Sequence, residues 1–153
     1  MKKTAILITV VIILLCSLCS CSDAVIRSLG KYSYCQAFSA GTFQDFTDYA
    51  KYKFVSPDLD TNKYLKQIQA SDIENLNEHL DDFEMCIDSL KRSNSAKELV
   101  EKYDFDRSII GTEDYLYIVS EKKTENGLTT FVTYSLYFYD IQSGMLYFFH
   151  NNT

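Results

Sequence analysis

The clearest hydrophobic pattern lies between Ser71 and Arg92. Apolar side chains recur there every three or four residues, the spacing that places them on one face of an α-helix: Ile73, Leu76, Leu80, Phe83, Ile87 and Leu90. Ser71 and Glu74 have the spacing of a capping box, whose side chains satisfy free N–H groups of the first turn. Acidic residues crowd the first turns and Lys91 and Arg92 close the last, as the helix macrodipole favours. This segment predicts one long amphipathic helix.

Weaker patterns flank this helix. In the segment TFQDFTDYAKYKF (42–54), an apolar stripe predicts a first helix, with Thr42 as a candidate N-cap. The stripe consists of Phe43, Phe46, Ala50 and Phe54. The aromatic density of the segment also suits a strand. The only proline, Pro57, marks a loop. Alternation over 63–69 predicts a short strand, and residues 95–103 predict a short helical turn.

The last third of the chain changes to a strand period. Residues 114–121, 130–140 and 145–151 are rich in aromatic and β-branched side chains, and Asn126-Gly127 and Gly144 supply hairpin turns. The segments predict three antiparallel strands in a meander. Alternate residues of the middle strand are assigned to the core under the long helix: Val132, Tyr134, Leu136 and Phe138.

These elements predict an α+β fold. It consists of an N-terminal helix, a short strand, the long helix, and a three-stranded antiparallel meander packed on that helix. The order of helix and meander is similar to that of cystatin-like and NTF2-like folds, an analogy that does not assign a function.

The N-terminus has the pattern of an export signal. Lys2 and Lys3 precede the run Ala5–Leu15, which is apolar except for Thr9 and is too short to span a bilayer comfortably. The residues that follow, Leu18-Cys19-Ser20-Cys21, resemble the lipobox of bacterial lipoproteins. Cys16 and Cys19 do not fit that motif, because a bulky leucine precedes each.

The lipoprotein resemblance implies that Cys21 carries a diacylglyceryl group and that the chain is cut just before it. We therefore expect a signal peptide at 1–20, a lipidated cysteine and tether at 21–36, and a single domain at 37–153. The protein is then held at the extracytoplasmic face of the cell membrane. A plain secretory signal or an uncleaved anchor is the alternative. Apolar residues in the tether indicate that part of it packs on the domain: Val25, Ile26, Leu29, Tyr32 and Tyr34.

Charge excludes one class of partner. The chain has 15 basic and 21 acidic residues, and loss of Lys2 and Lys3 leaves 13 against 21, a net charge of −8. This balance argues against nucleic acid, whose phosphates require a basic surface.

No motif carries catalysis or metal binding. His79 lies beside the stripe of the long helix as an expected boundary residue, and His150 ends the last strand with no second ligand at metal-site spacing. Asp58–Asn62 copies the start of a calcium loop, but Lys63 stands where the turn requires glycine. After the anchor only Cys35 and Cys86 remain, as a possible disulfide or as two thiols. No cofactor is expected.

Aromatic residues form the remaining candidate site. The chain has 12 Tyr, 10 Phe and no Trp. If the even positions of the middle strand are buried, a tyrosine-rich face points the other way and could grip a protein, a peptide or a glycan: Tyr115, Tyr117, Phe131, Tyr137 and Tyr139. The alternatives are that cross-strand pairs only stabilise the sheet, or that the first helix covers this face.

Three segments are also similar to small uncharacterised lipoproteins of gut-type Gram-positive bacteria: TFQDFTDYAKYKF, DFEMCIDSL and SLYFYDIQSGMLYFFHNN. This resemblance implies no activity or site residues. The sequence therefore favours a non-enzymatic, lipid-anchored envelope protein that binds a partner through its strand face. The alternatives are a small envelope hydrolase that uses His150 with a nearby acid or serine, and an immunity or inhibitor lipoprotein.

Acylation at Cys21 is directly testable. Radiolabelled palmitate should enter the wild-type protein and should not enter a Cys21→Ala variant, because the thiol is the acceptor. Equal incorporation into both chains, or none into either, would contradict the lipoprotein assignment.

Overall fold

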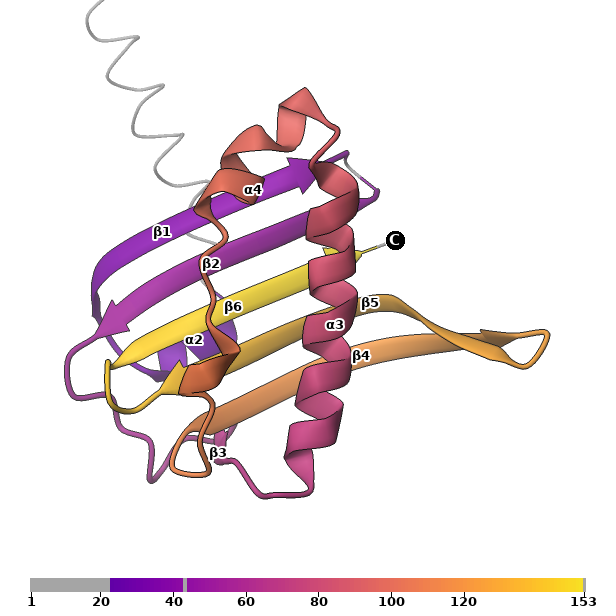
Figure 1. Ribbon diagram of the computed structural model, residues 1–153. Helices are drawn as coiled ribbons and strands as arrows, with labels where there is room; N and C mark the ends of the chain where they lie inside the picture. The colour runs from indigo at the N-terminus through magenta and orange to yellow at the C-terminus, as the bar shows by residue number, and fades with distance from the viewer. Residues whose placement is uncertain (1–22, 43, 153) are drawn as a thin grey trace, which may run out of the picture.

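A computed structural model describes residues 23–42 and 44–152 (Figure 1). More of them lie in strands than in helices, and the strands form one six-stranded antiparallel sheet in the order β1-β2-β6-β5-β4-β3. The elements are α2 (Ala24–Ser28), β1 (Tyr32–Gly41), β2 (Phe46–Phe54), β3 (Lys66–Gln67), α3 (Asp72–Leu90), η1 (Asn94–Ala96), α4 (Lys97–Lys102), η2 (Arg107–Ile109), β4 (Tyr115–Glu125), β5 (Leu128–Asp140) and β6 (Met145–Asn152).

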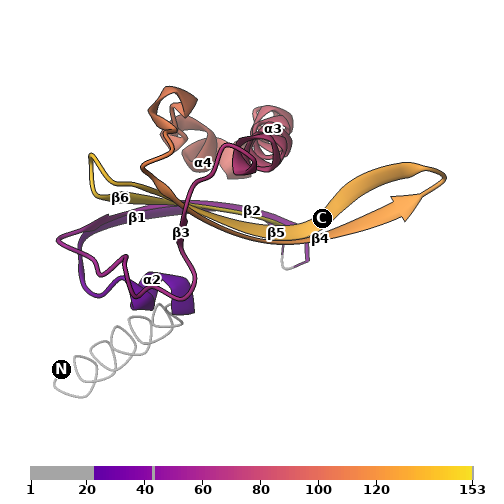
Figure 2. The ribbon, with the colours of Figure 1, turned by 90° about the horizontal axis from the view of Figure 1, so that it is seen from below.

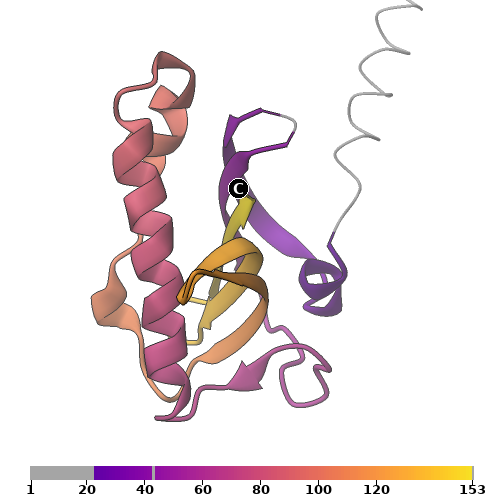
Figure 3. The ribbon, with the colours of Figure 1, turned by 90° about the vertical axis from the view of Figure 1, so that its right-hand side faces the viewer.

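The sheet lies between two unequal layers. Figures 2 and 3 show α3 and α4 on one side and the short α2 on the other. We call these the α3 face and the α2 face. The α3 face holds the larger buried cluster, which includes Tyr49, Leu136 and Phe149, and the α2 face holds a second cluster around Tyr137 and Tyr139. The central strands are therefore buried on both sides.

The predicted fold class is wrong. The long helix does not pack on a three-stranded meander, because β1 and β2 extend the sheet beyond β6 and β3 pairs with β4. The meander itself is present as β4, β5 and β6. Its turns have the expected left-handed backbone, with φ of 54° at Asn126, 80° at Gly127 and 66° at Gly144.

The predicted N-terminal helix at 42–54 is also wrong, because this segment contains strand β2. A strand with one dry face alternates apolar and polar residues. In β2, however, the neighbours Tyr49 and Ala50 are 0% and 3% exposed, because they face opposite buried layers. Burial on both faces removed the period-two signal, and the remaining spacing matched a helix by chance.

The long helix is confirmed as α3, although its start differs from the expected one. Ser71 occupies the N-cap position, but its side chain makes no capping bond. Asp72 instead accepts a hydrogen bond from the backbone N–H of Gln69 at 2.8 Å. The predicted stripe faces the sheet, and its central members are buried: Leu76, Leu80, Phe83 and Ile87.

Part of the expected tether is folded. Asp23 caps α2 by accepting from the backbone N–H of Val25 at 2.8 Å, and it also accepts a hydrogen bond from the Tyr137 hydroxyl. Val25, Ile26 and Leu29 are buried against the α2 face. Among residues 23–42 and 44–152, no helix has the length and apolar character needed to cross a membrane.

The α2 layer is fastened by one buried amide. Asn62 donates from Nδ2 to the Ser28 hydroxyl at 2.8 Å, and its Oδ1 accepts from the backbone N–H groups of Tyr64 and Leu65. Since buried polar groups need partners, this side chain holds the 55–65 loop against α2. Both segments then close over the same end of the sheet.

Phe149 is the centre of the aromatic core on the α3 face. It is fully buried, and its ring centroid lies 5.0 Å from Phe105, 5.2 Å from Phe83 and 5.5 Å from Tyr49. We expect Phe149→Ala to lower the free energy of unfolding by about 3–5 kcal/mol, because it removes a large buried ring and leaves a cavity. Urea denaturation measures the change. Val55→Ala, at a position 71% exposed, is the control and should change stability by less than about 0.5 kcal/mol. A loss below about 1 kcal/mol for Phe149→Ala would contradict this core.

Candidate functional site

The tyrosine face predicted from the sequence is mostly covered. Tyr137 and Tyr139 are each 3% exposed, because α2 and the 55–65 loop pack on them. Tyr115 and Tyr117 are half-buried at the margin of the same cluster. The covering element is α2 rather than the segment 42–54, which is a strand.

Phe131 does not belong to that face. It packs on the α3 face, where its ring centroid lies 4.4 Å from His79 and 5.1 Å from Tyr134. The cause is a register shift in the β4–β5 pair, where Glu121 lies opposite Thr133 but Lys122 lies opposite Phe131. An extra residue in one strand reverses the side-chain alternation beyond it. The prediction from strict alternation along the strand therefore fails at Val132.

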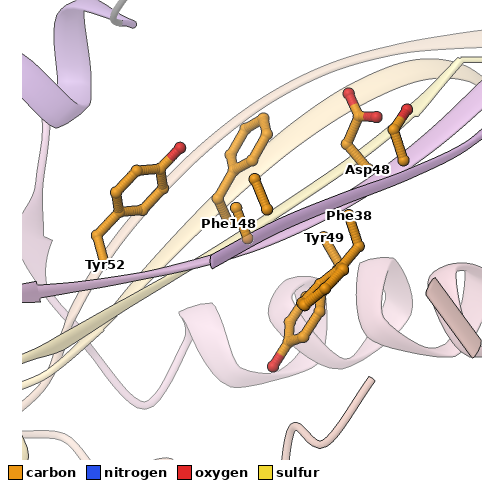
Figure 4. Close-up of a pocket in the computed structure, with 8 residues that line it drawn as sticks. Phe38, Asp48, Tyr49, Tyr52 and Phe148 are labelled. Carbon is orange, nitrogen blue, oxygen red and sulfur yellow. The ribbon is translucent and has the colours of Figure 1, made fainter. Parts of the chain in front are cut away.

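The uncovered half of the α2 face holds a pocket of about 300 Å³. It lies over β1, β2 and β6, and Figure 4 shows Tyr52, Phe148 and Asp48 on one side of these strands, with Phe38 and Tyr49 on the other. The residues that line it are Ala37, Phe38, Ser39, Asp48, Tyr49, Ala50, Tyr52 and Phe148.

Small residues make this pocket. Ala37 of β1 lies directly opposite Ala50 of β2, and Ala50 lies opposite Phe148 of β6. Because α2 covers the other end of the sheet, no helix fills the space above these two alanines among the described residues. The Tyr52 and Phe148 rings then stand as walls around a shallow floor.

Asp48 gives the pocket its charge. No hydrogen bond or ion pair is formed by its carboxylate within the part of the chain that the structure describes. Its cross-strand neighbour on β6 is His150. The pocket is therefore apolar with one acidic end, suited to a flat apolar group that carries a cation or a hydrogen-bond donor.

His150 continues this acidic end into a polar row across three strands. Its Nδ1 shares a hydrogen bond of 2.8 Å with the Ser135 hydroxyl on β5, and its ring lies 5.0 Å from Phe46 and 6.2 Å from Phe148. Burial lowers the pKa of His150, and the nearby Asp48 carboxylate opposes that shift. At neutral pH the imidazole is therefore uncharged.

The row of Asp48, His150 and Ser135 lacks the oxyanion-binding N–H donors of a serine hydrolase. Serine acyl transfer needs N–H donors aimed at the developing oxyanion. Ser135 and His150 sit on β5 and β6, each flanked by a strand on both sides, so their backbone amides belong to the ladder. The row can hold a ligand by hydrogen bonds, whereas it offers no backbone donor for an oxyanion.

Cys35 and Cys86 are not joined by a disulfide. Cys35 is exposed on the edge strand β1. Burial raises the pKa of Tyr52 on the α2 face, and the neighbouring Cys35 thiol raises it further. Cys86 lies on α3 at the opposite face, where its sulfur accepts from Asn151 at 3.2 Å. Of the two alternatives, the structure has two thiols, because the sheet separates the two side chains.

His79 is not the boundary residue expected from the sequence. It is 1% exposed, and its Nδ1 lies 2.7 Å from the Asn75 carbonyl oxygen while Nε2 is buried without a partner. Burial lowers its pKa. In the Asp58–Asn62 turn, Asp58 accepts from Thr61 rather than facing a metal. Across residues 23–42 and 44–152, no three His, Cys, Asp or Glu side chains are placed to hold a metal ion.

Sequence reasoning missed the pocket because it assigned 42–54 to a helix. As a strand, this segment places Asp48, Ala50 and Tyr52 on one face by simple alternation. The position of Phe148 over Ala50 required the β2–β6 pairing, which no local pattern supplies. Cys21, the expected lipidation site, lies outside the described residues.

Comparisons of the chain with protein families, curated proteins and solved structures find no match. The site is therefore interpreted from its own chemistry.

The setting of His150 predicts its titration. Its NMR titration midpoint should lie below 6.5, because burial disfavours the charged ring. Asp48→Asn should lower the midpoint further by removing the opposing charge, and Asp88→Asn on the far side of α3 should leave it unchanged. Since the unfolded chain holds the proton to higher pH, stability should fall as the pH drops from about 6.5 towards the folded midpoint. A midpoint above 6.5 would contradict the burial of His150.

Proposed function

We propose that this protein is a lipid-anchored, non-enzymatic binding module of the cell envelope, attached through Cys21 and binding its partner at the pocket of the α2 face. The observation that carries the proposal is the open apolar pocket with the Asp48 carboxylate at one end. The anchor is supported by the lipobox resemblance.

Asp23, the first described residue, and the pocket lie on the same face of the sheet. Asp23 is fixed there by the Tyr137 hydroxyl, and only two peptide units join Cys21 to Asp23. Two extended residues span at most about 7 Å, so an acylated Cys21 lies close to the α2 layer. The reach of the protein from the bilayer is then short.

The chemistry of the pocket defines the class of partner. Its volume is at the lower end of the range for ligand sites, about 300–1,000 Å³, so it takes one side chain or one sugar ring. Tyr52 and Phe148 offer ring faces for stacking, and Asp48 selects a basic or hydrogen-bond-donating group. A protein or peptide that presents a lysine or arginine, or a glycan with donor groups, fits these requirements.

The hydrolase alternative has one observation in its favour, the hydrogen bond between Ser135 and His150. It also has a geometric objection, because the amides near Ser135 belong to an interior strand pair. A binding role uses the side chains of Asp48, His150 and Ser135 and needs no N–H donors for an oxyanion. We therefore prefer binding to catalysis.

The proposal is tested by crosslinking in intact cells. Asp48→Arg inverts the charge at the pocket end and should remove the partner from the crosslinked species, with at least a tenfold loss of its band. Asp60→Arg makes the same change on the exposed 55–65 loop, outside the pocket lining, and should retain the band. Identical partner profiles for wild type and Asp48→Arg would count against this pocket as the binding site.

A further inference from the structure

Within residues 23–42 and 44–152, β1 pairs with β2 alone, and its other edge is unusual for an edge strand. Its ten residues, YSYCQAFSAG, include no charged residue and no proline. Natural sheets protect long edges with lysine, proline, bulges or a covering segment, because unpaired N–H and C=O groups recruit another strand. At the opposite edge, β3 has only two residues, and the rest of β4 carries charged side chains at Glu121, Lys122 and Lys123.

The hairpin that joins β1 and β2 determines which backbone groups of β1 point away from β2. The Thr42 N–H donates to the Asp45 carbonyl at 2.7 Å, so Thr42 faces β2. Backbone direction alternates along a strand, so Ala40 and Phe38 also face β2, while Ala37 and Ser39 face outward. The bond from the Phe54 N–H to the Gly144 carbonyl fixes the same alternation independently on β2.

We propose that β1 pairs antiparallel with β1 of a second copy of this chain, about a two-fold axis at Ala37. Outward-facing residues then meet in hydrogen-bonded pairs, Ala37 with Ala37 and Cys35 with Ser39 of the second copy. The two sheets become one continuous sheet. A bulge at Ser33 marks the end of the regular edge.

A second copy fits this edge better than a foreign strand for two reasons. The chain is strongly acidic, yet the edge carries no charge, so two copies meet there without repulsion between directly opposed charges. The two-fold axis of an antiparallel strand pair is perpendicular to the sheet, and it leaves both α2 faces on the same side. Both copies can then be anchored in one membrane, an argument that rests on the proposed function.

The paired edge also joins the two candidate sites. Ala37 and Ser39 line the pocket and lie on β1 itself, so the two pockets meet across the axis. Tyr34, 43% exposed in one copy, comes to lie opposite Ala40 of the second copy and loses solvent contact. Anchoring in one membrane raises the effective concentration of the two chains.

Crosslinking of the full-length chain in its own membrane tests the register. Ser39→Cys places a thiol opposite Cys35 of the second copy, at the roughly 5.5 Å Cα separation of a hydrogen-bonded pair, within disulfide range. Oxidation with copper–phenanthroline should give a band of twice the single-chain mass. The same substitution with Cys35→Ser should not, because the remaining thiols are about 13 Å apart along the strand.

Mass measurement in detergent provides a second readout. The wild-type chain should have twice the single-chain mass by light scattering, and Ala37→Pro should halve it, because proline removes an outward N–H that β2 does not use. Ala37→Ser keeps this N–H and should retain the double mass. The crosslink does not depend on the proline variant folding.

Three outcomes would overturn the proposal. The first is a single-chain mass for wild type with no double-mass band from Ser39→Cys. The second is an equal band in the Cys35→Ser background, which shows another register. The third is a crosslink to a different protein, which shows a partner strand instead. The predicted crosslink together with no loss of partner in Asp48→Arg would support the dimer. That result would contradict only the proposed function.

Discussion

Burial of the central strands on both faces is the constraint on which the rest of the structure depends. Five successive residues of β5, from Leu136 to Asp140, are buried, which is possible in a strand only if each face has its own cover. The α3 face is covered by a long helix and an aromatic core around Phe149. The α2 face is covered by five helical residues and a loop fastened by Asn62.

The candidate site follows from the unequal size of these two covers. Because α2 is short, it closes only the end of the sheet where Tyr137 and Tyr139 lie. The other end is left to the alanines of β1 and β2, and the space above them is the pocket. The cap residue Asp23 links this arrangement to the expected anchor at Cys21. The packing of the α2 face and the position of the pocket are thus consequences of one short helix.

Local signals predicted the long helix and the strands that tight turns join. The α3 stripe, the β4–β5–β6 meander and the turns at Asn126 and Gly144 were predictable because their periods and turn residues are local. Strand β2 was not predictable, because burial on both faces removes the alternation of apolar and polar residues. Phe131 was assigned to the wrong face, because a bulge reverses the side-chain alternation along β5. The pocket needed the pairing of β2 with β6, which joins residues about one hundred positions apart.

The docking of α2 is the claim on which the covered tyrosines, the open pocket and the proposed place of the anchor all depend. The most direct measurement is a nuclear Overhauser spectrum that is read between the methyl groups of Val25 and Ile26 and the rings of Tyr137 and Tyr139. We predict contacts between these groups, together with helical chemical shifts over 24–28. Random-coil shifts there, with no methyl-to-ring contact, would contradict the account.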